Sequence, residues 1–124
     1  MGDDDPRQQR MEVPEGDRII ALAKLRQMGI DTAADPDPLI DLAQIATLAS
    51  FPGRSYQKNT VEVWRQRSRP TYRGKGKLLQ PFPEPDIIVP KAETGFLDKP
   101  KWRAITTIVA WLIEARRWHP DAAE

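Results

Sequence analysis

The side chains best suited to bind another molecule lie between residues 58 and 67. If this segment is a helix, Val61 and Trp64 fall one turn apart on one side. Amide and charged side chains then lie on or near the opposite arc: Lys58, Asn59, Glu62, Arg65 and Gln66. Arg can hydrogen-bond to guanine edges, Asn and Gln to adenine, and all three to phosphate. The spacing therefore predicts a helix that contacts DNA.

The charge of the chain is segregated along its length. Residues 42–83 carry eight basic and one acidic side chain, residues 1–41 carry five basic and ten acidic ones, and the net charge is only +1. A basic stripe in a near-neutral chain is typical of a surface that binds a polyanion, although a solvated basic face would have the same composition. We expect phosphate contacts from six residues: Arg65, Arg67, Arg69, Arg73, Lys75 and Lys77.

Composition excludes several other classes of function. The 124 residues include no cysteine, so disulfides and thiolate metal sites are excluded, and a single histidine, His119, is expected to be solvated. Gly74 and Gly76 lack the flanking strand and helix of a phosphate-binding loop, and no Ser, His and acid set or HExxH motif is present. We therefore expect no enzyme activity, no cofactor and no metal.

The sequence also gives an expectation about location. The longest apolar run is too short to cross a bilayer, and the N-terminus MGDDDPRQQR begins acidic rather than with a basic and then apolar segment. We expect a cytoplasmic protein with no membrane partner.

A second helix is expected immediately before the candidate DNA-contacting helix. Asp41 is followed three residues later by Gln44, which is the pattern of a capping box. The inward face of this helix would hold four apolar residues: Leu42, Ile45, Ala46 and Ala49. The loop SFPGRSYQ is longer than the turn of a compact helix-turn-helix, and the next helix could begin near Gln57 or at Thr60.

The N-terminal third is expected to hold one helix. Residues 1–14 are polar and proline-rich, which predicts a disordered tail, and residues 15–40 are expected to form a helix and a linker. The helix would run from Glu15 to Met28 and end at Gly29. Its apolar stripe is expected at Ile19, Leu22, Ala23, Leu25 and Met28.

The C-terminal half predicts a hairpin and a last helix. A basic loop comes first, in which Tyr72 could stack or pack. Two strands joined by a long loop are then expected, one at the β-branched run Ile87–Val89 and one at Lys101–Arg103. Such a hairpin would be a wing whose tip can reach a minor groove. Residues 106–118 predict a helix, and residues 120–124 a tail. Four apolar residues would line that helix: Ile108, Val109, Trp111 and Leu112.

The four tryptophans are expected to have two kinds of environment. Trp64 follows Val61 by three residues, so it is expected in the core, and Trp102 and Trp111 are expected to join the hairpin to the last helix. Trp118 is expected to be partly exposed near the chain end.

The order of four motifs, DLAQIATLA, TVEVWRQRS, PFPEPD and WRAITTIVAWL, resembles the small DNA-binding proteins of the excisionase, AlpA and MerR-like group. The resemblance covers about residues 41–114. It implies a mainly α fold with a small β-hairpin wing, a winged helix-turn-helix over residues 41–119 with an added N-terminal helix. It places six residues on the recognition helix: Lys58, Asn59, Thr60, Glu62, Arg65 and Gln66. Arg103 would brace the wing or touch a backbone phosphate.

Three hypotheses of function follow. The first is a sequence-specific protein for double-stranded DNA, either a transcriptional regulator or an excisionase-like factor that bends DNA for a recombinase partner. It could assemble as a homo-oligomer or cooperatively on DNA. The second is a DNA-packaging adaptor similar to a phage small terminase subunit. The third is a protein-binding module in which the basic stripe meets an acidic partner.

Overall fold

The computed structural model describes residues 12–69, 73, 80–95 and 97–119. In chain order, the described residues form α1 (Glu15–Gln27), β1 (Leu39–Ile40), α2 (Leu42–Ala49), α3 (Lys58–Arg67), β2 (Ile87–Val89), α4 (Lys91–Thr94), β3 (Lys99–Arg103), the π-helical segment η2 (Ala104–Val109) and α5 (Ala110–Glu114). The prediction of a mainly helical chain with a small β component is confirmed.

The strands form one small antiparallel sheet in the order β1-β3-β2. Ile40 lies opposite Trp102, and Ile88 lies opposite Pro100. The hairpin of β2 and β3 was predicted, but β1 lies in a segment that the sequence analysis treated as a linker. A strand of two residues beside several prolines is too short to produce an alternating pattern, so only its partner strand defines it.

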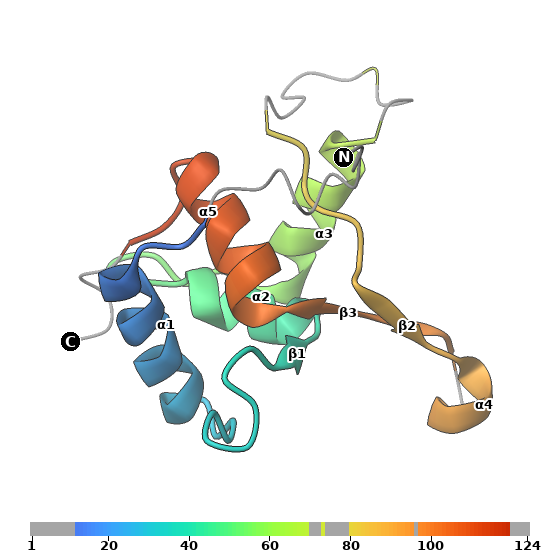
Figure 1. The fold of residues 1–124 in the computed structure, drawn as a ribbon. Helices are drawn as coiled ribbons and strands as arrows, with labels where there is room; N and C mark the ends of the chain where they lie inside the picture. Colours follow the sequence, from blue (N-terminus) through green and yellow to red (C-terminus); the bar gives the residue numbers. More distant parts are fainter. Residues whose placement is uncertain (1–11, 70–72, 74–79, 96, 120–124) are drawn as a thin grey trace, which may run out of the picture.

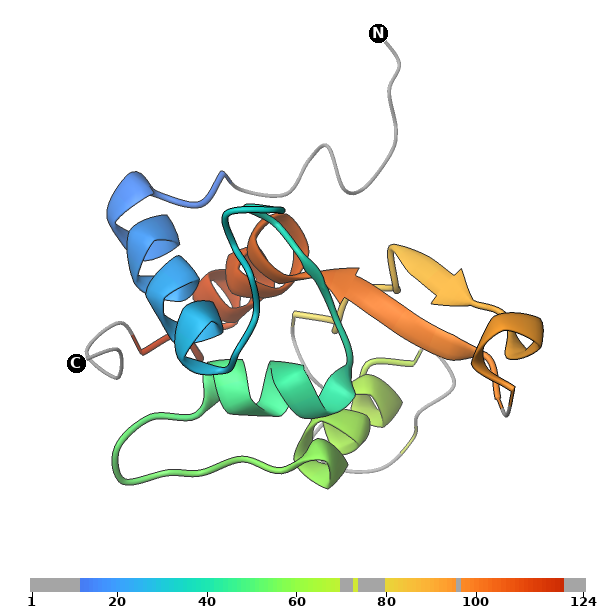
Figure 2. The ribbon, with the colours of Figure 1, turned by 90° about the horizontal axis from the view of Figure 1, so that it is seen from below.

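The core lies where the helices meet the central strand. Figures 1 and 2 show α2 between α1 and α3, with η2 and α5 packed across them. Leu25 of α1, Ile45 of α2, Val61 of α3 and Trp102 of β3 are completely buried in one continuous apolar cluster. Residues from α1, β1, α2, α3, β3, η2 and α5 therefore share a single core, which has no member among the described residues of β2 or α4.

Helix α1 has nearly the predicted bounds, and its predicted apolar stripe is right in part, because Leu25 is buried and Leu22 and Met28 pack against the core. Ile19 is 55% exposed, whereas Ala21, Lys24 and Leu25 are buried. Apolar residues occur around most of this helix, so their period does not select one face. The Nζ of Lys24 instead donates a hydrogen bond to the carbonyl oxygen of Ser50, at 2.9 Å.

Helix α2 begins with the predicted capping box. The carboxylate of Asp41 accepts a hydrogen bond from the backbone N–H of Gln44, and the Gln44 side chain accepts one from the N–H of Asp41, both at 2.9 Å. The four predicted inward residues are buried, together with Leu48. The following loop turns at Gly53, whose φ of +99° favours glycine.

The predicted last helix, residues 106–118, is wrong at both ends. It begins at Ala104 with the wide turns of η2, and α5 ends at Glu114. The chain then folds back, because Arg116 has a φ of +59° and the backbone N–H groups of Arg117 and Trp118 both donate to the carbonyl oxygen of Leu112.

The residues after α5 pack against the body. The Nε1 of Trp118 donates a hydrogen bond to Asp17 of α1, at 3.1 Å. The ring of His119 stacks on Phe51, with 3.7 Å between ring centroids. The prediction that His119 is solvated is therefore wrong, because the loop between α2 and α3 brings an aromatic partner to it.

Candidate nucleic-acid interface

Helix α3 begins at the earlier of the two predicted positions. Lys58 is its first residue and Gln57 precedes it in an extended conformation, without a side-chain cap. Lys58 and Asn59 are therefore part of the first helical turn and not of a preceding loop.

The inward side of α3 is fixed by aromatic packing. Val61 is fully buried and Trp64 is 5% exposed, as predicted. The indole of Trp64 meets Tyr56 edge to face, with 5.3 Å between centroids, and lies 5.6 Å from Trp111 of α5. These contacts hold the helix in one rotation about its axis.

A hydroxyl group also fixes the C-terminal end of α3. Ser68 Oγ donates to the carbonyl oxygen of Trp64 and accepts from the backbone N–H of Phe82, both at 2.7 Å. Phe82 in turn packs edge to face on Trp102 and Trp111. The end of α3 is thus tied to the segment that leads into the hairpin.

The outward side of α3 carries the predicted polar side chains. Five of them are exposed and belong to described residues: Lys58, Asn59, Glu62, Gln66 and Arg67. Thr60 and Arg65 are half-buried at the borders of this face. At about 100° per residue, Asn59 and Gln66 point most directly away from Val61 and Trp64. The exposed face therefore has amides on its midline, the acidic Glu62 beside them, and the basic Lys58 and Arg67 at its edges.

The side chain of Arg65 makes a contact within the protein that the sequence did not predict. Its guanidinium lies over the ring of Trp102, 5.1 Å from the centroid. Arg65 and Arg69 line a cavity of about 250 Å³ together with Ser68, Phe82, Pro83 and Glu84. Two guanidinium groups that line the same cavity, one from the last turn of α3 and one just after its end, can bind an anion such as phosphate.

Part of the predicted basic surface can be placed. Arg69 and Arg73 are exposed. Lys75, Lys77 and Tyr72 lie outside the described residues, so the expected contacts from them remain predictions.

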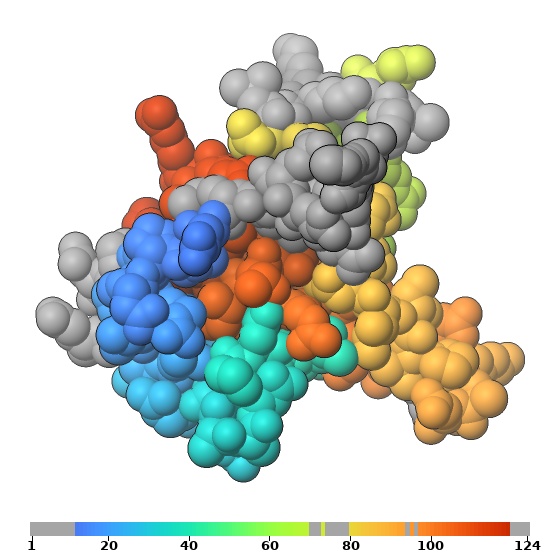
Figure 3. Space-filling view, viewed as in Figure 1, coloured from blue at the N-terminus to red at the C-terminus, as the bar shows by residue number. Residues whose placement is uncertain are grey.

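The β2–β3 hairpin projects from the body of the molecule and carries α4 at its tip (Figures 1 and 3). Helix α4, which was not predicted, ends at Gly95 with a φ of +78°, and the backbone N–H of Lys91 donates to Asp98 at 2.6 Å. Ile87, Ile88 and Leu97 of this hairpin are exposed large apolar residues.

Arg103 lies at the root of the hairpin. Its guanidinium donates to the carbonyl oxygen of Asp37, at 3.2 Å, and its backbone N–H donates to the carboxylate of Asp86, at 2.9 Å. Of the two roles expected for Arg103, this geometry agrees with bracing the hairpin.

No family model, curated protein or solved structure matches this chain. The interpretation of this surface therefore depends on its own residues.

Two negative findings apply to the described part of the chain. It contains no helix whose length and apolar character would let it cross a membrane. Among the same residues, His, Asp and Glu side chains do not gather into a group of three that could hold a metal ion.

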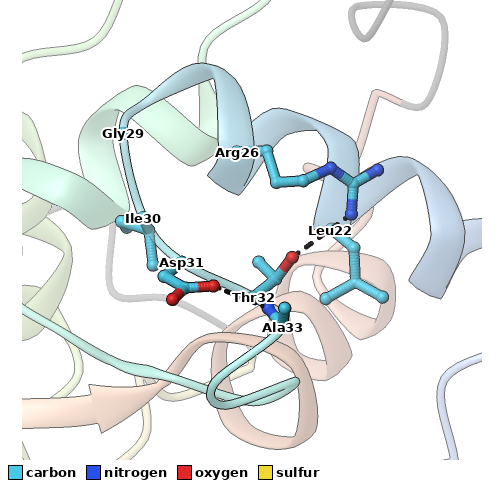
Figure 4. A pocket seen from close by; sticks show the side chains of 7 residues that line it. All are labelled: Leu22, Arg26, Gly29, Ile30, Asp31, Thr32 and Ala33. Carbon is cyan, nitrogen blue, oxygen red and sulfur yellow. Dashed lines mark hydrogen bonds between the residues drawn. The ribbon is translucent and has the colours of Figure 1, made fainter.

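A second cavity lies at the C-terminal end of α1, on a different part of the molecule (Figure 4). It has a volume of about 630 Å³ and is lined by Leu22, Arg26, Gly29, Ile30, Asp31, Thr32 and Ala33. The guanidinium of Arg26 donates to Thr32 Oγ1 at 3.2 Å, and Asp31 accepts from the N–H of Ala33 at 3.0 Å. The polar side chains Arg26, Asp31 and Thr32 that line this cavity thus hydrogen-bond to other lining residues.

The sequence analysis missed one residue of the α3 surface. Val63 is 38% exposed and lies between the polar residues of the outward face. Its distance of two residues from Val61 was a usable indication, because positions two apart on a helix do not share a face.

Proposed function

We propose that this chain is a sequence-specific protein for double-stranded DNA, acting as a transcriptional regulator or as an excisionase-like architectural factor. In this proposal α3 enters the major groove, and the hairpin and the basic loop that follows α3 contact the backbone or the minor groove. The proposal includes a cytoplasmic location and neither catalysis nor a cofactor.

The order of elements supports a winged helix-turn-helix. A short strand lies between the first two helices, a hairpin follows the third helix, and β3 lies in the middle of the sheet. This is the order expected of a winged helix-turn-helix, with α2 and α3 as its two characteristic helices and the β2–β3 hairpin as its wing. The long loop before α3 and the helix α4 in the wing are additions to the compact pattern.

The observation that carries the proposal is the outward face of α3. Its ten residues form a rod about 15 Å long, and an α-helix fits the width of the major groove. Trp64 and Val61 fix its rotation, so the exposed amides of Asn59 and Gln66 face outward together. Arg67 and Arg69 flank them with positive charge that can bind phosphate.

The test uses two exposed arginines. Arg67→Ala combined with Arg69→Ala should weaken binding to a duplex of random sequence and should flatten the dependence of log affinity on log salt by about two units. The matched control, Arg18→Ala with Arg26→Ala on α1, removes the same charge and should leave that slope unchanged. Fluorescence anisotropy over a salt series measures the affinity and its salt dependence for both double variants. Far-ultraviolet circular dichroism checks that each variant is folded.

The outcomes separate the three hypotheses. An equal loss of DNA affinity in both double variants would show that binding follows total charge only. It would contradict the assignment of the DNA-binding surface to α3. Absence of binding by the unmodified protein at low salt would favour a protein-binding module. A ring-sized particle in sedimentation analysis would favour a DNA-packaging adaptor.

The exposed hairpin supports an interaction with protein as well as DNA. Ile88 is 58% exposed on β2, which is an edge strand. Edge strands with apolar side chains pair readily with other chains. This observation favours cooperative assembly on DNA or contact with a recombinase. Ile88→Asp should then reduce cooperativity on tandem sites without reducing affinity for a single site.

A further inference from the structure

The outward face of α3 contains a single large apolar side chain among polar ones. Val63 is 38% exposed, one helical turn after Asn59 and three residues before Gln66, both of which are also exposed. Valine is β-branched and disfavours the helix slightly relative to alanine. Because this side chain lies outside the core cluster, packing among the described residues does not explain a valine at this position.

The two arginines of α3 are less suited to contact bases. Arg65 is held over Trp102 at the border of the face, beside a cavity shared with Arg69. Arg67 lies at the other border, about a quarter turn from the midline formed by Asn59 and Gln66. The guanidinium groups are therefore placed for phosphate, whereas the midline offers two amides, with Val63 beside it on one flank and Glu62 on the other.

This combination matches the edge of an A·T base pair. In the major groove, thymine presents a C5 methyl group, and the amide of Asn or Gln can make two hydrogen bonds to adenine N6 and N7. An apolar side chain next to an amide is thus complementary to a thymine and an adenine in adjacent or paired positions.

We propose that α3 selects an A·T-containing site, with the methyl group of a thymine packed on Val63 and an adenine edge bound by Asn59 or Gln66. This inference rests on the proposed DNA-binding function and adds its base preference. Arg65 and Arg69 bind phosphate at the C-terminal end of the helix and set its register along the groove.

The experiment begins by selecting bound duplexes from a pool with a random central segment. Each thymine of the selected site is then replaced in turn by deoxyuridine, which lacks only the methyl group. For the unmodified protein, one such replacement should weaken binding about fourfold, the effect of exposing one buried methyl group. The variant Val63→Ala should bind the thymine and uracil duplexes equally well.

Two further variants complete the test. Ile19→Ala removes an exposed aliphatic side chain from α1, away from α3, and should keep the sensitivity to uracil. Asn59→Ala or Gln66→Ala should reduce the preference for adenine over guanine at one position about tenfold. Val63 is exposed, so Val63→Ala should leave the circular dichroism of the protein unchanged.

Failure of this inference can be distinguished from failure of the proposed function. If a site is selected but no uracil replacement weakens binding, or if Val63→Ala remains equally sensitive, the assignment of Val63 is overturned while DNA binding stands. If the pool yields no enriched site and no salt-dependent binding, the proposed function itself is overturned, and the base preference with it.

Discussion

The guanidinium of Arg65 lies over the buried indole of Trp102, 5.1 Å from the centroid of the ring. The same indole donates a hydrogen bond from its Nε1 to the carbonyl oxygen of Pro83, at 2.9 Å. One tryptophan of β3 therefore joins the last turn of α3 to the segment that enters the hairpin. Together with the hydrogen bond from the backbone N–H of Phe82 to Ser68 Oγ, this contact ties the end of α3 to the hairpin.

Because Arg65 packs on Trp102, its removal should affect both stability and binding. We expect Arg65→Ala to lower the free energy of unfolding by roughly 0.5–1 kcal/mol, the usual range for a cation over an aromatic ring near the surface. Arg67→Ala, whose side chain is exposed, should change it by less than about 0.5 kcal/mol. Urea unfolding of the two variants measures this difference, and equal values would argue against a structural role for Arg65.

The buried amine of Lys24 should make stability depend on pH. Lys24 is 7% exposed, and burial lowers its pKa to about 8. The unfolded chain, with a lysine pKa of about 10.4, still binds a proton that the folded chain has released between these two values. Stability should therefore rise with pH across this window, by up to about 3 kcal/mol.

The control for this prediction is Lys24→Met, which removes the titrating group. Urea unfolding from about pH 7.5 to about pH 10.5 should show the rise in the unmodified protein relative to the variant. A difference between the two proteins that stays constant over this range would show that Lys24 keeps an ordinary pKa in the folded state.

Trp64 should be far more important for stability than Trp118. Trp64→Ala removes a side chain that contacts Tyr56 and Trp111, and should cost about 3–5 kcal/mol. Trp118 is half-buried at the periphery, so Trp118→Ala should cost clearly less. Chemical denaturation of both variants tests this order, and the reverse order would exclude Trp64 as the anchor of α3.

Asp37 should stabilise the start of η2 from a distant part of the chain. Its carboxylate accepts hydrogen bonds from the backbone N–H of Ile105, at 2.7 Å, and from both the N–H and the hydroxyl of Thr106. We expect Asp37→Ala to lower the free energy of unfolding by about 1–2 kcal/mol, as the loss of a helix cap does.

A matched variant for Asp37 is Asp31→Ala. The Asp31 carboxylate accepts hydrogen bonds from the backbone of Ala33 and Ala34 within its own exposed turn. Its loss should cost less than the loss of Asp37. If thermal unfolding shows equal effects, the contact between Asp37 and η2 contributes no more to stability than a local turn.

Features that depend on neighbours in sequence were predicted well. The capping box of Asp41 and Gln44 requires residues three apart, and the buried pair of Val61 and Trp64 requires one helical turn. The outward face of α3 then follows from its inward face. The hairpin was predicted from the β-branched run Ile87–Val89 and the extended segment Lys101–Arg103 that follows it.

Features that depend on distant residues were missed. β1 exists only because β3 pairs with it, and Asp37 caps a segment that begins more than 60 residues later. The packing of Arg65 on Trp102 also requires the hairpin to lie beside α3. No local pattern around any of these residues indicates its partner, so sequence periodicity could not reveal it.

Pairing of β1 with β3 means that α2 and α3 cannot be excised as an independent unit. A fragment starting at Asp41 would leave the edge of β3 beside Trp102 open and would uncover the face of η2 that α1 covers. Open strand edges recruit other chains and aggregate. Tags or fusion partners therefore belong upstream of α1, where the shared sheet remains intact.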